Sequence, residues 1–325
     1  MSKDLSIISN RVVATVFILL CHIIKYYTFI PAHNILGQLF NVGVHIFIII
    51  SGFLYGKKSG SAEYGKKDYI HFLFQRYQRV VFPCQTWAII LFFATFCSNL
   101  PNTIMVLFNL QGLRWIFRFN SILDGGPLLS HTWFLTVIFI CYMLIPVFNR
   151  LSALLNLGQL ALFYVFAIVL EYARISTFLF LLFLIAFKVG KERIDLHLIR
   201  LRYVFLCLFV ALFVRILGNY YFDGTVFYNQ IISGLSHQML AWCIFIIVDR
   251  LVFVSKIALY IAKSNFVSFL DRHSFSIYLV HYFMIPWLFT NFSIWKATIV
   301  FVIASVSLAV VLDLMVTKMS ALLFK

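Results

Sequence analysis

The stretch RVVATVFILLCH, Arg11 to His22, decides the fold class, because the residues between its two ends suit the interior of a membrane. It lies within an apolar run over 5–30, which is longer than the roughly 20 residues that a membrane-spanning helix needs. The whole chain is 63% hydrophobic and 11% charged, whereas a soluble domain carries about 25% charged residues. The sequence therefore predicts an integral membrane protein.

The apolar runs predict an all-α protein, a bundle of about ten transmembrane helices, because the runs are continuous rather than alternating. They cover 5–30, 35–56, 80–99, 131–148, 153–171, 174–190, 201–218, 230–248, 274–291 and 297–315. We expect a single transmembrane domain over 1–325 with no appended soluble domain. The first run lacks a small-residue cleavage site, so we expect it to remain as a helix. The segment KKSGSAEYGKKD (57–68) has the composition of a flexible linker.

The distribution of Lys and Arg predicts that both termini are cytoplasmic. With that orientation, the cytoplasmic loops hold most of the 26 basic residues, and the outer loops hold only Arg114, Arg118, Arg174 and Lys296. Helix orientation thus explains the net charge of +15, and no nucleic-acid partner is expected. The longest outer loop, 100–130, predicts a segment on the outer face, either a functional lid or a passive interfacial helix.

Metal and disulfide chemistry are not expected from this sequence. The six cysteines all lie in apolar runs without CxxC spacing, and we expect them to be buried. No two histidines have HxxxH spacing, and the acidic residues mostly stand at helix ends. The sequence therefore predicts no bound metal.

Arg11 and His22 share one face of the first predicted helix. At about 100° per residue, eleven residues make three turns and roughly 20°, with Thr15 and Ile18 on the same stripe. The two polar ends then stand roughly 16 Å apart along the axis. Ionisable groups inside a membrane are costly and usually mark function. The alternatives are a histidine bonded to a neighbouring helix and an arginine that reaches the cytoplasmic interface.

Two arginines at the start of the third run predict a phosphate-binding site. Arg76 and Arg79 in QRYQRVVFP are three residues apart, on one helix face at the cytoplasmic mouth. A guanidinium group donates parallel hydrogen bonds that match phosphate oxygens. The alternative is a positive anchor that only orients the helix.

Other polar side chains in the apolar runs are further candidates. Substrate contacts are predicted for Ser51, His131, Trp133 and His281. The sequence assigns neither a site nor a packing role to His45, Lys25, Arg215 and His237.

Five motifs, in order along most of the chain, resemble the acyltransferase-3 family of membrane acyltransferases. The first is the pair Arg11 and His22, eleven residues apart. It is followed by GVHIFIIISGFLYG, RYQRVVFP, HTWFLTVIFICYMLIP and SFSIYLVH, each similar to a segment of that family.

The resemblance implies a ten-helix bundle in the bacterial plasma membrane that takes an acyl group, usually acetyl, from cytoplasmic acetyl-CoA. The implied acceptor is a sugar hydroxyl of a polysaccharide or lipid-linked glycan, as in capsule, O-antigen or exopolysaccharide. Acetyl-CoA is then a substrate, membrane lipid surrounds the bundle, and no permanently bound cofactor is expected. By the family pattern His22 is catalytic, and Arg11, Arg76 and Arg79 bind acyl-CoA. The acceptor sugar and the oligomeric state, a homo-oligomer included, stay open.

Two departures from the family pattern affect these expectations. Many members carry a Glu pair where this chain has Ile138 and Phe139, so it resembles the branch with WFL. Position 45 is often acidic in the family and is His45 here. Some relatives continue into a hydrolase-like domain, and the end at Lys325 predicts that transfer is completed in the membrane domain.

The resulting hypothesis has neutral His22 as the general base that takes the proton from the sugar hydroxyl. Trp133, Ser51 or a backbone N–H would stabilise the oxyanion. An acetyl-His22 intermediate is an alternative within the same class. A different class, a transporter or flippase for a lipid-linked glycan or small anion, fits the basic mouth too. The sequence shows no inverted repeats, which argues against a transporter.

Overall fold

The computed structural model describes residues 4–26, 37, 39–59, 66–95, 100–117, 129–222 and 224–324. In this part of the chain the residues are predominantly helical and no strand occurs, which confirms the all-α prediction. Half of the expected linker (60–65 of 57–68) and part of the predicted outer loop (118–128) lie outside the described residues.

The chain folds into two compact units, each built from segments that are distant in the sequence. The first unit contains 1–62 and 145–274, and the second contains 63–144 and 275–325. Helix α16 (Asn265–Asn291) contributes its first part to one unit and its second part to the other. The expectation of a single domain over 1–325 stays a prediction.

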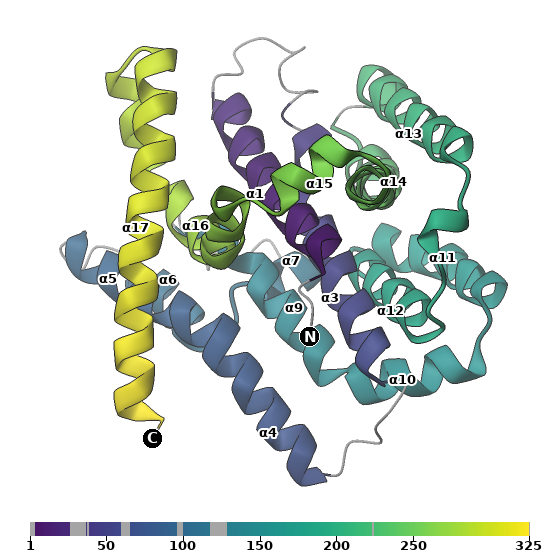
Figure 1. Ribbon diagram of the computed structural model, residues 1–325, viewed down its shortest axis with the longest axis horizontal. Coiled ribbons are helices and arrows are strands. Elements are labelled where there is room, and N and C mark those ends of the chain that lie inside the picture. The colour runs from purple at the N-terminus through teal and green to yellow at the C-terminus, as the bar shows by residue number, and fades with distance from the viewer. Residues whose placement is uncertain are drawn as a thin grey trace. The chain divides into compact units, whose positions relative to one another are not determined.

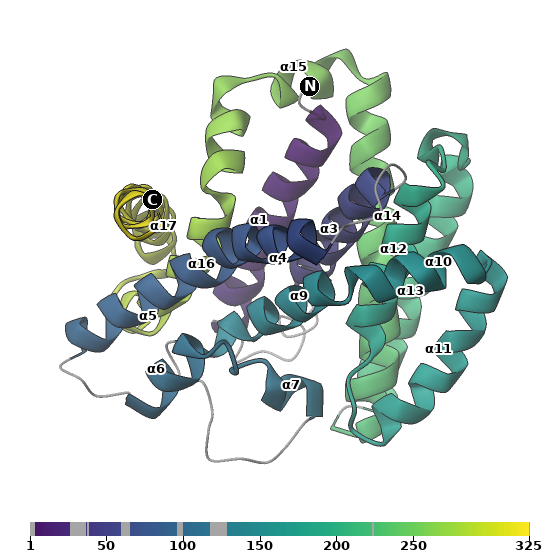
Figure 2. The same cartoon turned by 90° about the horizontal axis from the view of Figure 1, so that it is seen from below.

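The first unit is organised around α1, a continuous helix of 22 residues. Its described elements are α1 (Leu5–Tyr26), α3 (Gly43–Ser59), α10 (Ile145–Leu154), α11 (Leu157–Tyr172), α12 (Phe178–Lys191), η3 (Leu196–Leu198), α13 (Leu201–Phe222), η4 (Phe227–Ile232), α14 (Ser233–Val254), α15 (Lys256–Ala262) and the start of α16. Figures 1 and 2 show α1 beside α3 and α14, and α13 beside α14.

The second unit contains shorter helices and the long C-terminal helix. Its described elements are α4 (Lys66–Arg76), η1 (Tyr77–Val81), α5 (Phe82–Ala94), α6 (Leu100–Leu107), α7 (Leu113–Phe117), η2 (Ser130–Thr132), α9 (Trp133–Met143), the rest of α16, and α17 (Ile294–Leu323). Helix α17 packs on α5, and the ring of Phe324 contacts Phe74 and Phe82.

Glycines allow α3 and α12 to approach closely. Gly52 and Gly56, four residues apart, present bare backbone to α12, where a Cβ on Gly56 would lie 1.9 Å from the carbonyl oxygen of Phe187. In return, a Cβ on Gly190 would lie 2.1 Å from the carbonyl oxygen of Phe53. Small residues at this spacing let membrane helices pack backbone to backbone, which replaces the missing hydrophobic driving force within lipid.

A glycine also allows α1 and α3 to pack closely. A Cβ on Gly43 would lie 2.4 Å from the carbonyl oxygen of Ala14 on α1. Ala14 and Ile18 are buried at this contact. The C-terminal half of α1, which carries His22, is therefore an extension of a helix whose middle is fixed against α3.

Each of the ten apolar runs overlaps at least one helix, but the count of ten spans stays a prediction. Among the described residues, four helices are long and apolar enough to cross a membrane, and a fifth span arises if α9 and α10 together make one. Several of the others are shorter than a full crossing, as with the 13 residues of α5 and the 14 of α12, whereas α16 has 27 residues but is not among the helices that are apolar enough. The cytoplasmic placement of both termini likewise stays a prediction.

The cysteine prediction is wrong at one described position. Cys21, Cys84, Cys141 and Cys243 are buried and unbridged, whereas Cys207 on α13 is exposed. Most side chains of α13 point away from the unit, so an apolar run alone does not predict burial within the protein. Cys97 lies outside the described residues.

Candidate functional site

The residues predicted for the site fall on both units, and each group is described by itself. Arg11, His22 and Ser51 belong to the first unit; Arg76, Arg79, His131, Trp133 and His281 belong to the second.

The predicted stripe lies along α1 of the first unit. The side chain of Arg11 is 37% exposed, and His22 is half-buried three turns further on. Thr15 and Ile18, between them, are buried. The Thr15 hydroxyl donates to the carbonyl of Arg11 at 2.9 Å, so it satisfies its polar group within the helix. The ionisable ends of the stripe are thus more accessible than its middle.

Arg11 forms an ion pair with Asp271 on α16. Its Nε lies 2.9 Å from Oδ1 of Asp271, and its Nη2 donates to Oδ2 at 3.3 Å. The carboxylate is only 14% exposed. Asp271 was not among the residues predicted for the site. The signal was nonetheless present, because a carboxylate directly before an apolar run usually has an ion-pair partner.

Three more polar contacts fix the N-terminal half of α1. The Asp4 carboxylate lies 3.7 Å from Nζ of Lys57 on α3. The Ser6 hydroxyl donates to Asp249 on α14. The Asn10 amide, fully buried, donates to the carbonyl of Phe245, also on α14, at 3.4 Å. Helix α1 is therefore held by several independent partners.

Three of the four residues to which the sequence assigned no role, His45, Arg215 and His237, form a buried polar network in the first unit. Arg215 is 1% exposed, and its Nη1 donates to the Ser233 hydroxyl at 2.8 Å and the Ser236 hydroxyl at 3.2 Å. Nη1 also lies 3.4 Å from Nδ1 of His237, whose ring stacks on that of His45 at 5.2 Å. These contacts join α3, α13 and α14, which favours a packing role. Lys25 on α1 is exposed, and Ser51 on α3 is half-buried.

In the second unit, Arg76 directly precedes a π-helical turn and Arg79 lies within it. Arg76 ends α4 and lies over the ring of Phe72, 5.5 Å from its centre, and Arg79 lies in η1, exposed. Within η1 the N–H of Phe82 bonds to the carbonyl of Tyr77, a five-residue step. Pro83 lacks the N–H that would bond to the Arg79 carbonyl in an α-helix, which explains the local widening.

The structure brings together two histidines that the sequence could only name separately. Nε2 of His131 lies 3.1 Å from the carbonyl of Leu279, and Nδ1 of His281 lies 2.7 Å from the carbonyl of Tyr278. Because a carbonyl only accepts, these two nitrogens carry the protons. The rings are 5.1 Å apart and both are buried. Within the described part of the chain, Nδ1 of His131 has no hydrogen-bond partner.

The described part of the loop that was predicted to lie outside packs against the start of α9. Trp115 of α7 stacks on Trp133 with ring centres 4.3 Å apart. The Gly112 N–H donates to the Thr136 hydroxyl at 2.9 Å, and a Cβ on Gly112 would lie 2.3 Å from the Trp133 carbonyl oxygen. These contacts hold the described part of the loop on α9, next to His131.

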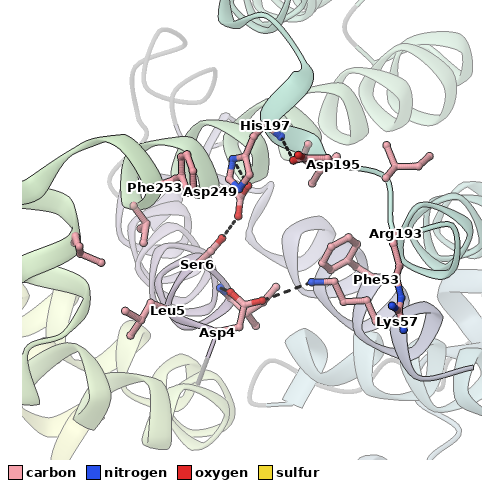
Figure 3. Close-up of a pocket in the computed structure, with 15 residues that line it drawn as sticks. Asp4, Leu5, Ser6, Phe53, Lys57, Arg193, Asp195, His197, Asp249 and Phe253 are labelled. Carbon is pink, nitrogen blue, oxygen red and sulfur yellow. Dashed lines mark hydrogen bonds and ion pairs between the residues drawn. The ribbon is translucent and has the colours of Figure 1, made fainter. Parts of the chain in front are cut away.

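A pocket of about 830 Å³ lies in the first unit, and none of the predicted site residues lines it (Figure 3). Asp249 accepts from Ser6 and lies 3.4 Å from Nδ1 of His197, and Asp195 accepts from the N–H of His197 at 2.8 Å. Lys57 reaches towards Asp4 across the pocket (Figure 3). The carboxylates that line the pocket are thus engaged by the chain itself. Among the described residues, no cluster of three or more His, Cys, Asp or Glu could hold a metal ion.

Comparison with known proteins identifies one family. A family model described as an acyltransferase domain matches residues 5–316, nearly the whole chain. No curated protein and no solved structure matches the chain.

Proposed function

Since the chain belongs to the acyltransferase-3 family and is a membrane acyltransferase, we propose that it moves an acetyl group from cytoplasmic acetyl-CoA to a sugar hydroxyl. The acceptor is a cell-surface or lipid-linked polysaccharide, and the protein resides in the bacterial plasma membrane. The observation that carries the proposal is the pair of accessible ionisable groups, Arg11 and His22, on one face of α1. A transporter is the less favoured reading, because the family match points to group transfer.

Three arginines support the proposed binding of acetyl-CoA. Coenzyme A carries several phosphate charges, and guanidinium groups match phosphate geometry. Arg11 remains 37% exposed in its ion pair, and Arg79 is exposed. Arg76 is half-buried over an aromatic ring, which limits its freedom and pre-orients its charge. These three groups are the proposed acyl-CoA contacts.

In the proposed chemical step, His22 acts as the general base. Its neutral imidazole accepts the proton of the sugar hydroxyl while the hydroxyl oxygen bonds to the acetyl carbon. The carbon–sulfur bond then breaks, and the proton returns from His22 to the thiolate, which leaves as free coenzyme A. Ser51 or the Trp133 indole N–H donates to the tetrahedral oxyanion. A covalent acetyl-His22 variant gives ping-pong kinetics instead.

The two histidines of the second unit are proposed acceptor contacts. In the neutral form, His131 and His281 each present one N–H to a backbone carbonyl and keep a lone pair on the other nitrogen. A lone pair of fixed direction can accept a hydrogen bond from a sugar hydroxyl. Rigid buried acceptors of this kind discriminate between hydroxyl positions more strongly than apolar contacts do.

The test is transfer of labelled acetyl from acetyl-CoA to extracted envelope glycans by the purified protein. We expect transfer with wild type and none with His22→Ala, while the exposed control His71→Ala behaves as wild type. Equal transfer by His22→Ala would overturn the role of His22. If wild type neither transfers label nor binds acetyl-CoA, the transporter reading replaces this proposal.

A further inference from the structure

The contact between Asp271 and Arg11 fixes the direction of the guanidinium group. Nη2 of Arg11 donates to Oδ2 of Asp271 at 3.3 Å, and Nε lies 2.9 Å from Oδ1 in an ion-pair contact that lacks hydrogen-bond geometry. One charge-assisted hydrogen bond and one close ion-pair contact on the same side restrict the directions that the guanidinium group can take. Nη1 and the second hydrogen of Nη2 do not contact Asp271. Their direction is set by the contact that Asp271 makes on the other side of the group.

Of the two partners, Asp271 is the more buried and Arg11 the more exposed. The carboxylate of Asp271 is 14% exposed and the side chain of Arg11 is 37% exposed. A largely buried carboxylate is ordered by its surroundings, and removing its positive partner would leave an uncompensated charge. The accessible part of the pair is therefore the guanidinium group.

The docking of α1 does not depend on Asp271 alone. Ser6 donates to Asp249, Asn10 donates to the carbonyl of Phe245, and Gly43 of α3 lies against Ala14. These contacts surround the position of Arg11 along the helix. The specific consequence of Asp271 is thus the orientation of one side chain rather than the placement of the helix.

We propose that Asp271 is a positioning residue for the donor, which aims Arg11 at a phosphate of acyl-CoA. This inference rests on the proposed function, because it takes Arg11 to be a donor contact. An arginine that is pre-oriented loses less side-chain entropy when it binds phosphate. Without Asp271, Arg11 keeps its charge but must be ordered by the ligand.

The test compares Asp271→Asn and Asp271→Glu with a matched control, Asp249→Asn, in the purified full-length protein. Both asparagine variants remove a carboxylate that contacts α1, but only one contacts Arg11. We expect Asp271→Asn to raise KM for acetyl-CoA about two- to tenfold, the cost of ordering one long side chain on binding, with kcat little changed. Asp271→Glu should recover much of this loss, and Asp249→Asn should leave KM unchanged. Calorimetric binding of coenzyme A should follow the same order.

Arg11→Gln separates failure of this inference from failure of the proposed function. If Arg11→Gln does not weaken coenzyme A binding, Arg11 is not a donor contact and the proposed donor site is wrong. If Arg11→Gln weakens binding while Asp271→Asn matches the Asp249→Asn control, the positioning role is wrong. A lower KM in Asp271→Asn also overturns it, since the carboxylate would then compete with phosphate for Arg11.

Discussion

The close approach of α3 and α12 makes a quantitative prediction for Gly56→Ala. The added Cβ would lie 1.9 Å from the Phe187 carbonyl oxygen and 2.8 Å from the Lys191 nitrogen, both backbone atoms. Ordinary contact begins at 3.4 Å, so the two helices must part by about 1.5 Å at this point. Overpacking costs about 1–3 kcal/mol when side chains can yield. Here a backbone atom would have to move, so we expect about 3 kcal/mol.

That cost corresponds to a fall in thermal midpoint of about 6–12 °C for a unit of this size. The measurement is thermal unfolding in detergent, followed by tryptophan fluorescence. Gly158→Ala is the control, because the nearest atom to its Cβ is the Asn156 side-chain oxygen at 3.3 Å, and alanine favours the helix. A Gly56→Ala midpoint equal to that of wild type, or a matching drop in the control, would refute the backbone contact.

Three further predictions concern buried polar groups, each checked by the same unfolding assay. Arg215→Met leaves two serine hydroxyls and His237 without their donor and should cost about 2–4 kcal/mol. Lys188→Met removes the donor to the Ser152 carbonyl at 2.8 Å and should cost about 1–3 kcal/mol. Tyr278→Phe removes the hydrogen bond to the His131 carbonyl, so we expect about 1 kcal/mol and slower acetyl transfer.

The elements of this fold could be predicted because apolar runs need no knowledge of partners. Every run overlaps a helix, and the eleven-residue spacing of Arg11 and His22 survives because α1 is unbroken. The glycines of GFLYG, Gly52 and Gly56, are four residues apart, a spacing that allows close helix packing. It was not among the predictions, and nothing in the stretch indicates α12 as the partner. Helix lengths were less predictable, since π-helical turns and breaks such as the one at Leu144 interrupt the runs.

The pairings within the site could not be predicted for a physical reason. Arg11 and Asp271 are 260 residues apart, and His131 contacts the backbone of Leu279 at a separation of 148. Such contacts depend on which helices pack together, and periodicity within one helix carries no information about that. The residues of the pocket likewise come from the start of α1, the end of α3, the end of α14 and the segment before α13.

The unbroken α1 leads to a last prediction about how the donor is recognised. Arg11 and His22 are fixed roughly 16 Å apart by helix geometry, so under the proposed function one acyl-CoA molecule would contact Arg11 with its phosphates and His22 with its thioester. Acetyl-N-acetylcysteamine has the same thioester and no phosphates. Arg11→Gln should therefore lower kcat/KM about tenfold or more for acetyl-CoA, but less than about twofold for the truncated donor.

His22→Ala serves as the control in this comparison, because it should abolish transfer from both donors. The assay is initial-rate acetyl transfer at subsaturating donor, so that kcat/KM is measured directly. If Arg11→Gln impairs both donors equally, Arg11 acts on the thioester end or on the fold, and the two-ended arrangement along α1 is wrong. A loss confined to acetyl-CoA means that the phosphates and the acetyl group are recognised by separate residues of one helix.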